Sequence, residues 1–282
     1  MKRTPVSASA PVDLHLHTAH SDGRWQSADL FAYLKKHGFA IVAVTDHDTC
    51  TGISEMQAVG TSVGVHVLAG VEMSANWHGK PCHILCYANQ FRGDALEAVG
   101  KTVVSRQFQN TLAVHRELLN RGMMFPRQSE SLAHQQGRLV RPIDNATLLV
   151  HHNYVNSMSE ALEWIRDCGY VMETVPVSDV VLEAHQDGAV AVIAHPGRED
   201  GEVRRYEPLE LESLARECAL DGIEVWYPAH TVEQVAEFER IADTLRLFKS
   251  AGSDSHGPQQ RLPIPYSAGN IARLLAQCGV MV

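Results

Sequence analysis

The sequence lacks any long apolar run, which argues against a transmembrane helix. No stretch approaches the ~20 consecutive apolar residues that a bilayer-spanning helix needs. The N-terminus, MKRTPVSASAPVD, begins with basic residues but has no apolar core, so we interpret it as a loose tail and not as a secretory signal. We therefore expect no membrane partner.

Positive charge and paired cysteines are also scarce. The 24 Lys and Arg face 33 Asp and Glu, a formal net charge of −9, whereas a duplex nucleic-acid binder needs a basic face. None of the six cysteines forms a CxxC pair. Cys82 and Cys86 lie in the strand-like run CHILCY, where burial as small hydrophobic residues is expected. We expect no duplex nucleic-acid partner and a location in the reducing cytoplasm.

What is present fits one large α/β domain with a small insertion: 282 residues, of which 45% are hydrophobic. Short apolar runs alternate with amphipathic segments, as in parallel sheets buried on both faces. Seven such strands favour a closed or nearly closed barrel. We expect them at 12–16, 40–45, 65–69, 83–87, 189–194, 223–226 and 247–251.

Polar residues and glycines mark where helices begin and end. Ser27 is predicted to cap a helix that ends at Gly38. Thr231 with Gln234 has the pattern of a capping box. Ser267 is predicted to open a last helix that stops near residue 279.

One region interrupts the alternation of strands and helices. Residues 95–177 contain a helix, a polar stretch and a second helix (SMSEALEWIRDCG), without a convincing strand. We interpret this region as a helical insertion that closes over one end of the barrel. The expected organisation is a first barrel part at 1–94, the insertion at 95–177 and a second barrel part at 178–282.

Histidines and carboxylates recur where the predicted strands end or begin. Residues two apart in a strand face the same side, so the H-x-H and D-x-H pairs can each point into a barrel mouth. Catalytic groups of barrels gather at the carboxyl ends of strands. The set comprises His15, His17, Asp22, His47, Glu72, His83, His195, Asp254 and His256.

Each motif alone has a simpler explanation. An isolated H-x-H is more often incidental than metal-binding, and TDHD could be a turn with capping aspartates. His83 alone would be a hydrogen-bonded core histidine, and Glu72 alone a surface carboxylate. Their succession at strand ends is what favours a site. Histidine and carboxylate ligands suit zinc, manganese or iron, and nine exceed what one ion can use.

As an ordered set, DLHLHT, SDG, TDHDT, GVEMS, CHILCY, AHPGR and GSDSH resembles the polymerase and histidinol phosphatase (PHP) family. The resemblance covers residues 12–90 and 188–258. Within the family, the chain is similar to the branch of metal-dependent phosphoesterases that act on nucleotides and short RNA. It implies a distorted seven-stranded (β/α) TIM-like barrel with up to three divalent ions.

The resemblance also implies how the ligands divide among the ions. For the first ion these are His15, His17, Glu72 and Asp254. For the second they are Glu72, as a bridge, with His83 and His195. For the third they are Asp22, His47 and His256.

The insertion departs from the related phosphoesterases, which carry an Arg-x-His motif and a Gly-Lys-Pro turn that contact the substrate. Here Arg141 is followed by Pro142 and Ile143, and the turn reads CGYVMET. Arg141 remains a substrate-binding candidate. His151 and His152 are better explained as polar residues at an exposed helix end.

A second group of residues is assigned to substrate and proton transfer. Arg198 could clamp a phosphate bidentately or be a surface arginine, and Arg24 is a weaker phosphate candidate. His230 could protonate the leaving oxygen or simply flank a helix. Asp46 and Asp48 could orient histidines, and Asp48 is also a catalytic candidate.

The sequence therefore predicts metal-assisted hydrolysis of a small phosphomonoester, a nucleotide or similar metabolite, by a metal-activated water. A 5′–3′ exonuclease acting on short RNA is the alternative within the same family. A C–N hydrolase or a non-catalytic metal-binding domain would also be compatible with such a ligand set. C–N hydrolases on related barrels use a modified lysine as the bridge, where this chain has Glu72.

Overall fold

The computed structural model describes residues 5–133, 136–199 and 203–282. Their contacts divide the chain into two compact units. The first runs up to Lys101 and resumes at Thr174, and the second spans Thr102–Glu173. Among the described residues, no helix is both long enough and apolar enough to cross a membrane.

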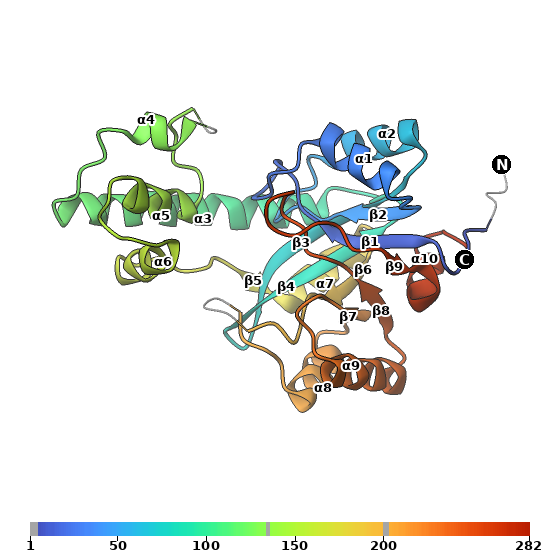
Figure 1. Cartoon of the computed structure of the whole chain (residues 1–282). Coiled ribbons are helices and arrows are strands. Elements are labelled where there is room, and N and C mark those ends of the chain that lie inside the picture. The colour runs from blue at the N-terminus through green and yellow to red at the C-terminus, as the bar shows by residue number, and fades with distance from the viewer. Residues whose placement is uncertain (1–4, 134–135, 200–202) are drawn as a thin grey trace. The chain divides into compact units, whose positions relative to one another are not determined.

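The first unit is built on one curved sheet (Figure 1). Within the described residues, its main path has the order β8-β7-β6-β4-β3-β2-β1-β9, and β5 pairs with β3. The strands are β1 (Pro11–Leu16), β2 (Ile41–Val44), β3 (His66–Trp77), β4 (Lys80–Ala88), β5 (Val175–Pro176), β6 (Val190–Ile193), β7 (Gly222–Trp226), β8 (Phe248–Ala251) and β9 (Tyr266–Ser267).

The ends of this sheet meet where the chain leaves β8. Asp254 N donates to His15 O over 2.8 Å, and His17 N donates to Ser255 O over 2.9 Å. This bridge to β1 nearly closes the barrel and confirms the predicted fold class. The seven predicted strands correspond to β1–β4 and β6–β8, while β5 and β9 are two-residue additions.

The expectation of a parallel sheet is wrong at β4. This strand runs antiparallel to both β3 and β6. It forms a hairpin with β3, whose two turn residues, His78 (φ 50°) and Gly79 (φ 77°), lie in the left-handed region that tight hairpins require. β3 also continues past Glu72 to Trp77, so Glu72 lies within a strand and not at its end.

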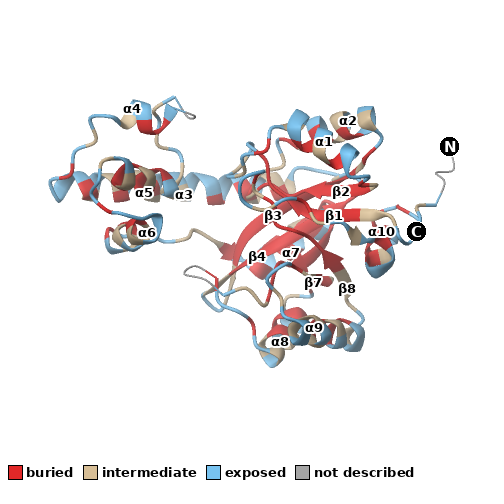
Figure 2. Ribbon diagram, viewed as in Figure 1, coloured by how far each residue is buried: buried red, intermediate tan, exposed pale blue. Residues whose placement is uncertain are grey.

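Helices cover the outside of the barrel: α1 (Ser27–Lys36), α2 (Ile53–Val63), α7 (Val177–Gln186), α8 (Pro208–Glu217), α9 (Val232–Leu245) and α10 (Ala272–Gln277), the last preceded by the 3₁₀ turn η2 (Ala268–Ile271). The strands are largely buried and the helices expose one face (Figure 2). In β2, Val42 and Val44 pack with α1 and α2, whereas Ile41 and Ala43 join a second cluster with α10. This alternation is the one expected of a strand buried on both faces.

Most of the predicted helix limits hold. Thr231 Oγ1 accepts from Gln234 N, and Gln234 Oε1 accepts from Thr231 N, which confirms the capping box of α9. Ser267 precedes the last helical segment as predicted. The expected cap at Ser27 is wrong, because Gln26 is the N-cap and the Ser27 hydroxyl donates to Glu55 instead.

The second unit contains most of α3 (Ala95–Asn120), with α4 (Gln128–Ser131), α5 (Pro142–His151) and α6 (Met158–Asp167). Its core gathers apolar side chains from α3, α5 and α6, including Leu118, Leu149 and Ile165. The expected polar stretch between two helices therefore contains α5. Asp144 caps this helix by accepting from the backbone N–H groups of Val140 and Arg141.

Candidate metal centre

Glu72 lies at the centre of the histidine cluster and is fully buried. Its Oε2 lies 2.9 Å from His15 Nε2 and 3.0 Å from His17 Nε2. Its Oε1 lies 3.0 Å from His83 Nδ1 and 3.1 Å from His195 Nε2. The two oxygens of one carboxylate thus face two different pairs of histidines, which is the arrangement that a bridging ligand needs.

The hairpin explains how His83 reaches this point. Because β4 runs antiparallel to β3, the beginning of β4 lies level with the end of β3, and His83 is paired with Ser74. The turn after β2 is held on the other side, where Asp48 N donates to Glu72 O. The same turn presents His47, whose Nε2 lies 3.5 Å from Glu72 Oε2.

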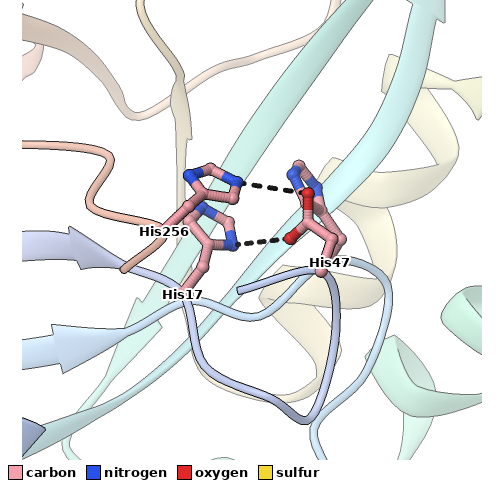
Figure 3. Close-up of side chains that lie close together, drawn as sticks. His17, His47 and His256 are labelled. Carbon is pink, nitrogen blue, oxygen red and sulfur yellow. Dashed lines mark ion pairs between the residues drawn. The ribbon is translucent and has the colours of Figure 1, made fainter. Parts of the chain in front are cut away.

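A further group of candidate ligands comprises His17, Asp22, His47 and His256. Figure 3 shows the three histidines of this group close together. The rings of His17 and His256 stack with centroids 4.1 Å apart, and His256 Nε2 lies 3.2 Å from Asp22 Oδ2. The loop that carries Asp22 folds tightly on β1. A Cβ on Gly23 would lie 2.6 Å from the backbone of His17, so only glycine fits there.

The three groups of side chains that could hold an ion overlap. One is His17, Asp22, His47 and His256, the next is His15, His17, Glu72 and Asp254, and the third is His47, Glu72 and His83. Asp254 Oδ1 lies 3.4 Å from His15 Nε2 and 3.3 Å from His17 Nε2. These groups contain eight of the nine predicted ligands, and the ninth, His195, joins the same cluster through its contact with Glu72.

Buried ring nitrogens without hydrogen bonds show that the cluster suits metal ions. Among the described residues, both nitrogens of His17 and the Nδ1 atoms of His83 and His195 are buried without a hydrogen bond of normal geometry. Such groups are costly unless something else binds them. Imidazole nitrogens and carboxylate oxygens are the donors that zinc, manganese and iron accept, so the residues fit the implied ions.

The electrostatics keep the central carboxylates ionised. Burial alone would raise the pKa of Glu72, but His15, His47 and His83 hold it well below its usual range. Burial would likewise raise the pKa of Asp254, and its neighbours His15 and His17 lower it instead. Both groups are therefore anionic, as metal ligands must be.

Two of the candidate ligands have backbone conformations that L-residues rarely adopt. His195 has φ 29° and Asp254 has φ 56°, and Asp48 beside the cluster has φ 52°. Such left-handed residues are uncommon outside glycine and asparagine and concentrate at functional sites.

Glu224 was missed by the sequence analysis. It is fully buried in β7, and its Oε1 lies 2.9 Å from His15 Nδ1. Its Oε2 accepts from His195 N over 2.7 Å. One carboxylate thus orients two candidate ligands, and it fixes the His15 tautomer so that Nε2 faces Glu72. A single glutamate inside the strand-like run GIEVW gave no signal of this role.

Asp13 was also missed and ties the two ends of the barrel together. Its buried carboxylate accepts from the backbone N–H groups of His15, Ser253 and Ile264. Burial raises the pKa of Asp13 to about 6. These bonds set the position of β1 against the segment that carries Asp254.

Asp46 and Asp48 were expected to orient histidine rings, but the hydrogen bonds of their carboxylates hold neighbouring segments of the chain instead. Asp46 accepts from Thr18 N and Oγ1 and from Ser21 Oγ, and so holds the loop after β1. Asp48 accepts from Ser74 N at 2.8 Å and from Ser74 Oγ at 2.7 Å. Burial raises the pKa of Asp48 to about 6.

Both ring nitrogens of His230 are engaged in hydrogen bonds with the backbone. Its Nδ1 donates to Val225 O over 2.9 Å, and its Nε2 accepts from Gly197 N over 3.2 Å. Burial lowers the pKa of His230, which favours this neutral ring. The geometry assigns His230 the positioning of the loop between His195 and Arg198, not the donation of a proton to the leaving group.

The substrate-binding candidates lie in different places. Arg198 Nη1 lies 3.7 Å from Asp254 Oδ2 and lines a cavity of about 450 Å³ with Tyr227, Asp254, His256, Gln260 and Arg261. Arg24 is exposed, and its backbone N donates to His256 O. Arg141 belongs to the second unit, at the N-cap of α5.

A barrel whose mouth gathers histidines and carboxylates around a shared glutamate defines a metal-dependent hydrolase. Comparison with family models is specific: residues 13–226 match the PHP domain. The chain belongs to the PHP domain family, and the expectation of a phosphoric ester hydrolase is confirmed at the level of this class.

Relatives with named activities match nearly the whole chain. A phosphoribosyl 1,2-cyclic phosphate 1,2-diphosphodiesterase from Eggerthella lenta is 29% identical and covers 89% of this chain and 96% of its own. A 3′,5′-nucleoside bisphosphate phosphatase from Chromobacterium violaceum is 28% identical, with 88% of each chain covered. A 5′-3′ exoribonuclease from Haemophilus influenzae is 26% identical, covering 87% of this chain and 90% of its own.

Solved structures share the fold. A proposed metal-dependent phosphoesterase from Bifidobacterium adolescentis superposes with a TM-score of 0.79 at 22% identity, over 95% of this chain and 96% of its own. An amidohydrolase from Chromobacterium violaceum, solved with sulfate and without metal, has a TM-score of 0.76 at 25% identity, over 92% of each chain.

Proposed function

We propose that this chain hydrolyses a small phosphomonoester, a nucleotide or a related metabolite, with up to three divalent ions of zinc, manganese or iron. The position of Glu72 is the observation that supports this most, because its two oxygens face separate pairs of histidines. When bound, the ions would supply Lewis acidity and a water acidified to near neutral pH.

The residues of the chain supply the rest of the mechanism. The nine candidate ligands would hold the ions, with Glu72 as the bridge, and Glu224 would fix His15 and His195 in place. Arg198 would hold the phosphoryl group beside the centre through charge-assisted hydrogen bonds. The loop that carries Arg198 is positioned in turn by His230.

The small-substrate part of the proposal rests on charge. A net charge of −9 provides no basic track for a polymer backbone, and a cavity of about 450 Å³ is of the size that takes compact ligands. The second unit would act as a substrate lid. A cytoplasmic location is also proposed, and it fits six cysteines that are all free thiols.

A competition assay tests the substrate class. The protein is loaded with manganese and assayed on nucleoside monophosphates and on single-stranded RNA oligonucleotides across a range of ionic strength. We expect the monophosphates to be preferred, with little dependence on salt, and activity to be lost with chelator. Activity that rises with oligonucleotide length and falls steeply with salt would establish the exonuclease alternative instead.

A parallel assay tests the bond that is cleaved. The same preparation is offered linear amide and lactam substrates, whose hydrolysis cleaves a C–N bond. Turnover of these with none of any phosphoester would establish the C–N hydrolase alternative. Full metal loading with turnover of neither class would leave a non-catalytic metal-binding domain.

A further inference from the structure

The first turns of α3 lie against the turn that follows His47. Cys50 N donates to Glu97 Oε2 over 2.6 Å. Three residues further along the helix, a Cβ on Gly100 would lie 2.2 Å from Asp48 O. Glycine weakens the interior of a helix, and this close approach explains why one stands here. Two neighbouring positions of α3 therefore contact the segment 48–50.

His47 depends on this segment because its ring lacks a partner that orients it. The His15 ring has such a partner, since its Nδ1 lies 2.9 Å from Glu224 Oε1. Among the described residues, no group makes a hydrogen bond of normal geometry with the His47 ring, whose Nε2 lies 3.5 Å from Glu72 Oε2. His47 is one of four candidate ligands that we call the Asp22 group: His17, Asp22, His47 and His256.

The segment 48–50 is held from two sides. On one side β3 holds Asp48, whose backbone N donates to Glu72 O over 2.9 Å and whose carboxylate accepts from Ser74. Asp48 has φ 52°, a conformation that persists only where the surroundings enforce it. On the other side Glu97 holds Cys50 N. Both residues are partly buried, so loss of the carboxylate would leave a poorly solvated N–H group.

Glu97 has two simpler explanations. It lies in the first turn of α3, where a negative charge stabilises a helix. Its Oε1 also lies 3.5 Å from Lys101 Nζ, but the Lys101 side chain is 73% exposed, and exposed ion pairs contribute little. Neither explanation involves the metal centre, and each predicts a different response to mutation.

We propose that Glu97 is a positioning residue for the metal centre, which holds Cys50 N and thereby sets the affinity of the Asp22 group for its ion. The inference rests on the metal centre of the proposed function and not on its substrate. α3 continues to Asn120 and contributes to the core of the second unit. One helix thus serves both that core and the turn beside His47.

A chelator titration of the cobalt-loaded protein tests this, with visible absorption and elemental analysis following the release of each ion. Glu97→Ala should weaken the binding of one ion by about tenfold, the low end of the cost of losing an orienting partner, and leave the others unchanged. Glu97→Gln should retain most of the affinity, because its amide oxygen can still accept from Cys50 N. Gly100→Ala should weaken the same ion, although alanine is the better helix former.

Two further variants identify the ion and the contact. Asp22→Ala should remove the ion of the Asp22 group, and in that background Glu97→Ala should cause no further loss. Lys101→Gln is the matched control, which removes the ion pair with Glu97, keeps the contact with Cys50 and should bind metal like the wild type.

Several outcomes would overturn the proposal. Wild-type affinity in Glu97→Ala is one, and equal weakening of every ion, which indicates general destabilisation, is another. A loss that persists in the Asp22→Ala background would show that Glu97 acts on a different ion. If Glu97→Gln is as weak as Glu97→Ala, the charge at the start of α3 matters and not the hydrogen bond.

Hydrogen exchange separates this proposal from the proposed function. In the protein as purified, the amide of Cys50 should exchange at least about tenfold faster in Glu97→Ala than in the wild type or Lys101→Gln. Unchanged exchange would overturn the positioning role whatever the metal content. A protein that shows both effects but hydrolyses no phosphoester would refute the proposed function and leave the role of Glu97 established.

Discussion

Glu72 is the residue on which the candidate centre depends, since it contacts histidines from four separate segments of the chain. Glu72→Gln removes the charge that two ions would share and keeps the side-chain size. We expect turnover to fall by at least about a hundredfold, more than for loss of any single histidine, because even partners of ligands contribute 10–100-fold. Turnover and metal content across the nine single mutants measure this.

Glu233→Gln, on the exposed first turn of α9, is the control for a lost glutamate charge. It should retain both metal and activity. Near-native turnover in Glu72→Gln would show that Glu72 does not bridge the ions.

Glu224 gives a prediction about metal affinity. Glu224→Gln keeps the volume but replaces one acceptor, towards His195 N, with a donor. Metal affinity should fall by about 10–100-fold, the usual cost of losing a partner that orients a ligand. Competitive metal titration with a chromophoric chelator measures the affinity directly, without reference to turnover. Wild-type affinity would mean that His15 and His195 are held without Glu224.

At the residue scale, the sequence identified the side chains that converge but not those that orient them. His15 and His17 were recognisable because H-x-H has a spacing that metal sites use. Glu224 and Asp13 have no such spacing, since each acts on a residue more than two hundred positions away or on backbone N–H groups. For His230 the sequence left open a proton donor or a residue that flanks a helix, because its bond to Gly197 depends on how two loops meet.

At the element scale, the close approach of β8 and β1 at Gly252 is what lets the barrel close. A Cβ at this glycine would lie 2.1 Å from His15 Cβ and 2.8 Å from Glu224 Oε1. Gly252→Ala should therefore displace His15, lower metal content and destabilise the fold by about 1–3 kcal/mol, as overpacked cores do. Chemical denaturation and elemental analysis measure the two effects.

Gly64→Ala is the matched control, because Gly64 has φ 83° with open space around its Cα. It should cost about 1 kcal/mol of stability through backbone strain and leave metal content unchanged. Full metal content in Gly252→Ala would show that the closure tolerates a side chain.

Element types were largely predictable and strand direction was not. The run CHILCY reads as a buried strand in either direction, and antiparallel pairing was decided by the tight turn at His78 and Gly79. The third strand was expected to end at Glu72, as a strand of a parallel barrel would. In the structure β3 continues to Trp77, because it pairs with β4 in the hairpin. α5 was missed because its polar N-terminal residues precede a short apolar face around Leu148 and Leu149.

For the whole molecule, we predict two to three transition-metal ions per chain in protein prepared without chelator. Three overlapping groups of candidate ligands support this number. Elemental analysis measures it, and dialysis against chelator followed by readdition of manganese, zinc or iron shows which ion restores turnover. One ion or fewer with full activity would contradict a cluster of several.

The second unit is predicted to choose the substrate without holding the ions. Arg141→Ala should raise KM, or change the ranking of substrates, by about tenfold if one charged contact is lost, while metal content stays constant. Arg166→Ala, on α6 of the same unit, is the control. Loss of metal on replacing Arg141, His151 or His152 would contradict the prediction that the second unit holds no ion.

The predicted insertion of 95–177 is wider than the second unit, and contacts of α3 explain why. Its first turns belong to the barrel: Leu96 N donates to Asp187 Oδ2, and Gly100 lies against the backbone of Asp48, where a Cβ would come within 2.2 Å of its oxygen. A helix pattern gives no sign of where along its length the packing partner changes.

The meeting of β1 with the segment after β8 has a consequence for the order in which the protein is made. His15 leaves the ribosome more than two hundred residues ahead of Asp254 and His256. A growing chain can bury Glu72 and its first histidines but cannot complete the cluster until Asp254 and His256 have also been synthesised. Chains truncated before residue 254 would therefore be made without a finished centre.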